Sequence, residues 1–263
     1  MERSVGQKLV GAFVVGGLIA SFMQCIMTVV RMVLPVPALV SPVSLALLGL
    51  VGMVLVLNGS YRKLEEIGGF GAGIMFCGIV DAVSGAFMRG AMEEGGTPGS
   101  GTKAACRFAA VMLGSFVVLG IVLGLLLART PGVLASMNVV AANSLDPGPI
   151  VFLYAFLVGG LFSAEGQALI ELTPLPMPAV LLGHAALGML LAILGVSTPF
   201  EVIAGAGLCA TIVDAGAGAV LSGAAIVLSG TPMRAIVFVL LMVLVVVMGI
   251  ICGNVVLKRV KGA

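Results

Sequence analysis

Long apolar stretches separated by short polar ones occupy almost the whole of this chain. Each stretch holds on the order of 20 residues, the length that a helix needs to cross the hydrocarbon core of a bilayer. The stretches are Leu9–Val30, Pro42–Leu57, Gly68–Met88, Ala104–Ala128, Ile150–Ile170, Pro178–Val196, Val202–Leu228 and Ile236–Leu257. An isolated strand cannot satisfy its backbone hydrogen bonds in lipid. The pattern therefore predicts an all-α polytopic integral membrane protein with about eight hydrophobic helices.

Two of the stretches, Gly68–Met88 and Val202–Leu228, are rich in glycine, and each is the third of its half of the chain. Glycine lets backbones pack closely and also permits a helix to break. Broken backbone at membrane depth is tolerated only where protein or water covers it. We expect these segments to be broken or re-entrant. If they turn back, each half crosses an odd number of times and the halves are inverted; if they cross, the halves are parallel, and the sequence leaves both open.

The chain also repeats itself. Ala12–Leu18 returns as Ala155–Leu161 (155 − 12 = 143), and Ile79–Ala82 returns as Ile212–Ala215 (212 − 79 = 133). Internal duplication in a very apolar chain is typical of transporters and channels, whose pathway often lies between two repeats. The predicted units are a membrane repeat at 1–130, a linker at 131–149 and a second membrane repeat at 150–263.

Composition supports a membrane location and excludes several other classes. Hydrophobic residues make up 60% of the chain and charged residues 9%, with a mean hydropathy of +1.27. A soluble domain carries about 25% charged residues, so this chain lacks the side chains for a water-facing surface. The net charge of +2 is too small to indicate nucleic acid as a partner.

The sequence does not predict an enzyme. It has no GxSxG, HExxH or P-loop motif, its five cysteines form no CxxC pair, and it has one histidine. We therefore expect no catalytic residues, no cofactor, no disulfide framework and no metal site.

Positive charges give a weak indication of sidedness. With eight crossings both termini share one side, which carries eight Lys and Arg residues against five on the other. Positive residues accumulate on the cytoplasmic side, so we expect both termini in the cytoplasm and the protein in the cell (inner) membrane.

Four polar residues recur inside apolar stretches. Asp81 and Asp214 occupy matching places in the two copies, and so do Gln24 and Gln167. A carboxylate in hydrocarbon is costly, so each Asp should face protein or water, either as a proton- or cation-responsive pathway group or as a helix cap beside a break. Each Gln is either a hydrogen bond between helices or a substrate contact.

Four further polar residues are candidates for the pathway. Glu165 lies in the middle of a stretch, where it could pair with His184, Arg31 or Arg89. His184 is read either as a buried, hydrogen-bonded residue or as a ligand. The glycines expected at helix breaks or close-packing sites are Gly16, Gly17, Gly71, Gly73, Gly85, Gly159, Gly160, Gly205, Gly207 and Gly218.

The sequence resembles a known family. Tyr154–Leu161, followed by Gly166 and Gln167, is similar to the AFxVGGxxxxxGQ signature of the SpoVA spore membrane proteins of the AC and AE types, and Ile203–Gly207 resembles their FAGAG segment. The first copy keeps most of these residues but has Met23 where the signature has glycine. The chain departs from the family in fusing two copies, and in lacking the proline and TGFAN-like stretch that follow AGAG.

The resemblance implies a component of a membrane channel complex. Members of the family are linked to moving dipicolinic acid, with calcium, across the inner membrane of the developing spore and to its release in germination, together with other SpoVA proteins. Arg31 and Arg89 would be the side chains that meet such an anion. Two hypotheses follow: a channel or transport subunit with its pathway between the halves, and a non-conducting membrane scaffold that assembles partner proteins.

Overall fold

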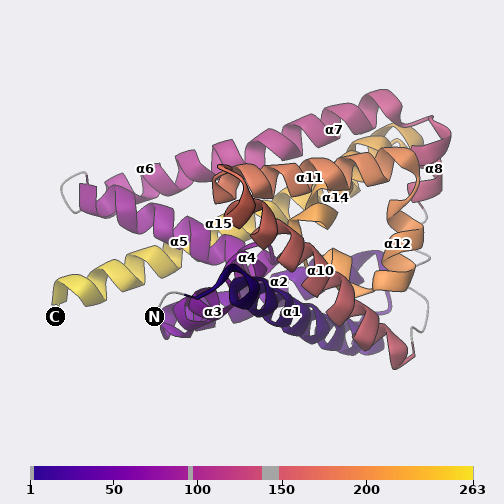
Figure 1. Cartoon of the computed structure of the whole chain (residues 1–263). Coiled ribbons are helices and arrows are strands. Elements are labelled where there is room, and N and C mark those ends of the chain that lie inside the picture. Colours follow the sequence, from indigo (N-terminus) through magenta and orange to yellow (C-terminus); the bar gives the residue numbers. More distant parts are fainter. Residues whose placement is uncertain (1–2, 94–96, 138–147, 263) are drawn as a thin grey trace.

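The structure is a computed structural model, and it describes residues 3–93, 97–137 and 148–262. Nearly all of these residues are helical (Figure 1). Within these described ranges, seven helical segments are long and apolar enough to cross a membrane, which confirms the predicted all-α polytopic class. They are α1 (Val5–Val33), η1–α2 (Pro37–Leu57), α6–α7 (Pro98–Leu127, with a π-helical turn at Ala110–Gly114), α10 (Ile150–Leu172), α11 (Met177–Leu194), α14 (Ile212–Ser229) and α15 (Met233–Gly262).

The two glycine-rich stretches are broken, as their composition predicts. In the N-terminal half, α3 (Ser60–Gly68) and α4 (Phe70–Gly73) precede α5 (Phe76–Glu93). In the C-terminal half, α12 (Ser197–Ala204) and α13 (Ala206–Cys209) precede α14. Gly69 and Gly205 make the breaks at φ 48° and 52°, values that side chains with a Cβ rarely adopt. Neither glycine-rich stretch is therefore one continuous helix.

Both broken segments turn back to the end of the molecule from which they enter. Figure 1 shows α3 beside the N-terminus and α5 returning from the middle to the same end, where α6 begins. The short helix α8 (Pro131–Ser136) and α12 lie at the opposite end, and α14 returns towards them. Ser197 at the start of α12 donates to Ser136 of α8, at 2.9 Å. Within the described residues, each half thus contributes three membrane-length helical segments and one re-entrant hairpin, and α14 is the returning arm of the second hairpin although it is itself long and apolar enough to cross.

This arrangement inverts the second half relative to the first. The long segments are α1, α2 and α6–α7 in one half, and α10, α11 and α15 in the other. Three is odd, so α10 begins at the end opposite to that where α1 begins, while both termini lie at the same end (Figure 1). Of the two arrangements that the sequence leaves open, the geometry favours the inverted one. The linker assigned to 131–149 contains α8, and 138–147 lie outside the described residues.

The two halves meet along α1 and α10, where small residues allow close approach. The Phe13 and Phe156 rings lie edge to face, 5.5 Å apart. A Cβ on Gly17 would lie 2.7 Å from the Phe156 carbonyl oxygen, and one on Gly160 would lie 2.8 Å from that of Phe13. The other glycines of this interface are Gly16 and Gly159. These are close-packing positions, as the sequence predicts.

Candidate functional site

Each of the two glutamines predicted from the sequence accepts a hydrogen bond from a backbone amide at the helix break of the opposite half. Gln24 Oε1 accepts a hydrogen bond from the Ala206 amide at 2.8 Å, and Gln167 Oε1 accepts one from the Phe70 amide at 2.7 Å. Both side chains are buried. A broken helix leaves amides without carbonyl partners, and a buried unpaired amide is costly. Of the two readings of these residues, the geometry matches the hydrogen bond between helices, here made to backbone.

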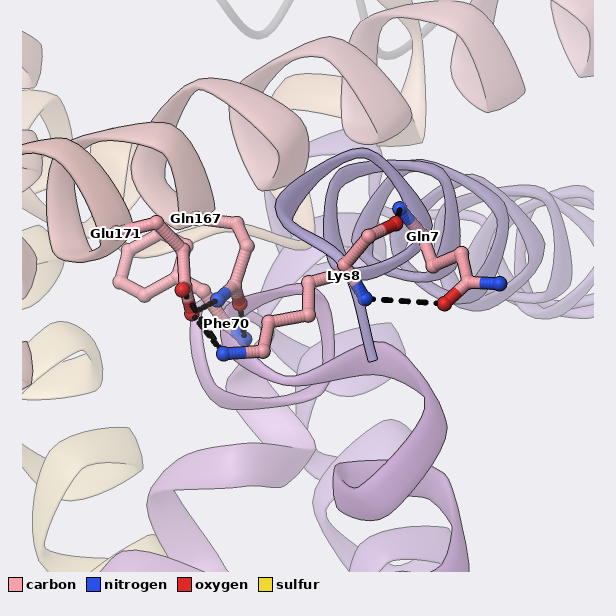
Figure 2. A network of polar contacts seen from close by, with 6 residues as sticks. Gln7, Lys8, Phe70, Gln167 and Glu171 are labelled. Carbon is pink, nitrogen blue, oxygen red and sulfur yellow. Dashed lines mark hydrogen bonds and ion pairs between the residues drawn. The ribbon is translucent and has the colours of Figure 1, made fainter. Parts of the chain in front are cut away.

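At Gln167 the hydrogen bond belongs to a larger network, shown in Figure 2. The Gln167 side-chain amide donates to Glu171 at 2.9 Å, and Glu171 pairs with Lys8 at 2.9 Å. The network fastens the start of α1 to the end of α10. The positions that correspond to Glu171 and Lys8 in the other copy, 143 residues away, are Thr28 and Val151, so the ion pair exists at one end only.

The tips of the two hairpins pair with each other in the middle of the molecule. Phe76 donates its amide to the Ala210 carbonyl at 2.8 Å, and Ile212 donates to the Ile74 carbonyl at 3.1 Å. Met75 and Thr211 are opposite each other in this antiparallel bridge. The N-terminal ends of α5 and α14 therefore meet at the bridge, and helix N-termini carry partial positive charge.

Each hairpin brings two carboxyl groups close enough to interact strongly with each other. Glu65 pairs with Asp81, and Glu201 pairs with Asp214. Two carboxylates this close repel each other unless a proton lies between them. Arg234, at the start of α15, is close enough to interact electrostatically with both members of the second pair.

The sequence pointed to the aspartates and missed the glutamates. The two glutamates are 136 positions apart (201 − 65 = 136), the same offset as the break glycines (205 − 69 = 136). The aspartates differ by 133, so they lie almost one helical turn out of register, and their predicted equivalence is wrong. The signal that could have found the glutamates is E-x-I-x-G, which ends at the break glycine in both copies.

A cavity of about 430 Å³ lies beside the second carboxyl pair. Its polar walls are Ser41, Glu201, Cys209, Thr211, Asp214, Ser222, Thr231 and Arg234. Its apolar walls include Leu39, Leu45, Phe76, Leu221, Phe238, Leu241 and Met242. Lining residues at η1 and at the start of α15 belong to the end away from the termini, whereas Phe76 and Thr211 belong to the central bridge. The cavity thus extends from that end to the central bridge.

The remaining candidates are distributed unevenly around this cavity. Asp214 and Gly218 line it, whereas Asp81 is on the opposite hairpin, within electrostatic reach of Arg89. Arg89 is exposed near the end of α5, and Arg31 lies in the last turn of α1. A Cβ on Gly85 would meet one atom within 4 Å, Arg89 Nη1 at 3.6 Å, so Gly85 is not a close-packing site.

The other expected glycine sites are close contacts. A Cβ on Gly71 would lie 2.3 Å from the Ala12 carbonyl oxygen, and one on Gly207 would lie 2.7 Å from that of Ala155. Both contacts fasten the short helix after a break to the first long helix of its own half. Neither position has room for a Cβ.

His184 pairs with Glu165, one of the three partners considered for that glutamate. The imidazole is buried, its Nε2 lies 2.7 Å from the Glu165 carboxylate, and its Nδ1 lies 2.8 Å from the Val180 carbonyl oxygen. A carbonyl can only accept, so Nδ1 carries a hydrogen. Nε2 is within ion-pair distance of the carboxylate without the geometry of a hydrogen bond. Among the described residues, no group of three or more His, Cys, Asp or Glu could hold a metal ion.

Comparison with known proteins identifies the first half of the chain. Residues 8–128, which run from α1 to the end of α7, match the SpoVAC/SpoVAEB sporulation membrane protein family. Searches of curated proteins and of solved structures found no match. The matched segment, with its two long helices, its re-entrant hairpin and the π-interrupted helix that follows, belongs to the SpoVAC/SpoVAEB sporulation membrane protein family.

Proposed function

We propose that the protein is a channel or transport component that moves a small solute across the membrane between its two halves. The observation that carries this proposal is the cavity that extends from one end of the molecule to the bridge between the two hairpin tips at its centre. Irregular backbone at membrane depth is found where it lines a cavity, and discontinuous helices form the binding sites of many transporters.

The cavity has the size and mixed character of a small-molecule site. Its volume of about 430 Å³ lies within the usual range for ligand pockets. One wall holds Arg234 with the Glu201–Asp214 pair, and the others are apolar. With one proton on the carboxyl pair the three groups sum to zero charge, and without it they sum to −1. The site therefore suits a solute with an apolar body and one polar edge.

Family membership supplies the first solute to test. Dipicolinic acid, moved with calcium, is the solute implied by the resemblance to SpoVA proteins, and other SpoVA-type membrane proteins are the implied partners. Dipicolinate has an aromatic body and two carboxylates, so Arg234 is the cavity side chain that would meet it. This replaces Arg31 and Arg89, which do not line the cavity.

Charge distribution supports an orientation with both termini in the cytoplasm. Of the 13 Lys and Arg residues, Arg31, Arg129 and Arg234 lie towards the end away from the termini, which leaves 13 − 3 = 10 towards the terminal end. The excess of positive residues at the terminal end is larger with re-entrant hairpins than with eight crossings. The reason is that Arg89, Lys103 and Arg107 lie on the terminal side only when the hairpins are re-entrant. The positive-inside bias therefore supports a terminal end in the cytoplasm and a cavity at the opposite face.

The test is solute efflux from liposomes that contain the purified protein and are loaded with calcium dipicolinate. Gly218→Leu fills the cavity from within, while Gly183→Leu makes the same change on the exposed face of α11, where a Cβ meets nothing within 4 Å. We expect wild type and Gly183→Leu to release dipicolinate equally and Gly218→Leu to release it at least about tenfold more slowly, since packed side chains leave no room for a solute.

Equal efflux from all three proteins would contradict a pathway through the cavity. No efflux from the wild type would contradict conduction by this chain on its own. In that case stoichiometric co-purification of other membrane proteins would favour the scaffold hypothesis.

A further inference from the structure

The two hairpins differ at one matched position, and the difference lies where the second hairpin borders the cavity. Cys209 ends α13 and Gly73 ends α4, 136 positions earlier (209 − 73 = 136). Ser41 and Met177 are separated by the same offset (177 − 41 = 136), and a proline follows each of them at the start of α2 or α11. These four residues form two corresponding contacts, one in each half.

In the C-terminal hairpin the contact leaves space. Cys209 Sγ lies 3.5 Å from Ser41 Oγ, and both side chains line the 430 Å³ cavity. These are two small side chains, and the cavity continues past them to Thr211 at the central bridge.

In the N-terminal hairpin the corresponding contact is filled. The Met177 methyl carbon lies so close to Gly73 that a Cβ added there would be 2.0 Å from it. The φ of Gly73 is not positive, so glycine is needed there for space and not for backbone freedom. The long side chain of Met177 thus packs against the N-terminal hairpin at the position where, in the other half, Ser41 and Cys209 line the cavity.

The properties of a methionine side chain fit a group that can block a passage and move out of it. Its side chain is unbranched and flexible, so it can leave a seat without disturbing the backbone, and it is apolar, so it excludes water and ions while seated. The start of α11 lies at the terminal end, close to Glu171 and Thr173 at the end of α10. The seat therefore lies on the route from the terminal face to the central bridge.

We propose that Met177, seated on Gly73, is the gate that closes the terminal-side access to the helix breaks. The protein then has two access routes related by its inverted halves. In this structure the route past Ser41 and Cys209 is open and the route past Met177 is closed. The inference deepens the proposed transport function by assigning a state and a gate, and access to the two routes can be measured without any transported solute.

The first test uses a membrane-impermeant, positively charged thiosulfonate reagent added to one face of oriented proteoliposomes, with each labelled cysteine identified by mass spectrometry. In the wild type, Cys209 is expected to react from the face away from the termini, whereas Cys77, which is buried outside the cavity, is not. Gly73→Cys is expected to react slowly from the terminal face. Adding Met177→Ser, which gives the N-terminal hairpin the side chains of the other one, should speed that reaction at least about tenfold, because a reagent reaches a thiol only where packing leaves room.

Equal reactivity of Gly73→Cys with and without Met177→Ser would overturn the gate. So would failure of Cys209 to react from the far face in the wild type. Unchanged Cys209 labelling in every variant reports that the fold is kept.

If Gly73→Cys does not fold, Met177→Ala alone keeps the proposal testable. It is expected to raise dipicolinate efflux several-fold, and Met32→Ala, an exposed methionine at the end of α1, is expected to leave efflux unchanged. Equal efflux in wild type, Met177→Ala and Met32→Ala would overturn the gate. A complete absence of efflux together with the expected labelling would overturn the transport function and keep the gate.

Discussion

At the scale of single residues, side chains replace the backbone carbonyls that each helix break removes. Gln24 and Gln167 each accept from the first amide after the break of the opposite half. These two buried side-chain amides therefore bind the protein's own backbone. The groups that border the cavity are instead the carboxyl pair and Arg234.

Replacing either glutamine by alanine leaves a buried amide without a partner. We expect Gln24→Ala and Gln167→Ala each to lower the free energy of unfolding by about 1–3 kcal/mol, the usual penalty for such a group. The measurement is thermal or denaturant unfolding in detergent, with Thr102→Ala, an exposed hydroxyl on α6, as the control. Two glutamine variants as stable as the control would contradict the assignment.

The contact between His184 and Glu165 makes a second prediction at this scale. A double-mutant cycle with His184→Gln and Glu165→Gln should give a coupling energy of about 0.5–3 kcal/mol, the usual range for side chains in direct contact. A parallel cycle of His184→Gln with Thr102→Ala should be additive within error. Additivity in the first cycle as well would show that the ring and the carboxyl group do not interact.

At the scale of elements, each broken hairpin depends on one glycine. Gly69 and Gly205 have positive φ, and a Cβ on either would lie within 2.6 Å of a glutamine side-chain oxygen. We expect Gly69→Ala and Gly205→Ala to destabilise the protein by at least about 1–3 kcal/mol through backbone strain alone. Gly183→Ala, in the middle of α11 with open space around it, should be neutral or slightly stabilising. An equal change in stability from all three substitutions would contradict the claim that the positive φ of Gly69 and Gly205 requires glycine.

The sequence predicted the elements better than it predicted their contacts. The length of each apolar stretch predicted the crossing helices, and the glycine content of Gly68–Met88 and Val202–Leu228 correctly predicted a break in each. Apolar length and glycine content are both local properties of the sequence. The match of Ile79–Ala82 to Ile212–Ala215 made the two aspartates equivalent at an offset of 133 residues (212 − 79 = 133). The break glycines are related by an offset of 136 residues (205 − 69 = 136), which is three residues more. Partners such as Glu65 and Glu201 were missed because pairing across a hairpin depends on where the chain turns, which periodicity does not encode.

At the scale of the whole molecule, re-entrant hairpins change the side on which two loops lie. With eight crossings, Lys103 is opposite the termini and Arg129 is beside them; with two re-entrant hairpins, both assignments reverse. Cysteines introduced at these positions into a cysteine-free variant should therefore label from the terminal face for Lys103→Cys and from the far face for Arg129→Cys.

Two positions provide the controls for this topology experiment. Arg62→Cys lies on the terminal side in both topologies, and Met32→Cys lies on the far side in both. Labelling of Lys103→Cys from the same face as Met32→Cys would contradict the re-entrant hairpins and with them the inversion of the halves.

The central claim is that two inverted halves meet through their broken hairpins at the middle of the molecule, and a cross-link at the bridge tests it most directly. Met75 and Thr211 form the pair whose flanking residues exchange the hydrogen bonds, a geometry with Cα atoms about 4.5 Å apart, within disulfide range. The measurement uses Met75→Cys with Thr211→Cys in a variant that lacks the native cysteines and carries a protease site between 138 and 147. After mild oxidation and cleavage, the two halves should stay joined without reductant and separate with it, whereas each single substitution should separate in both cases. Halves that separate without reductant in the double variant would contradict the account.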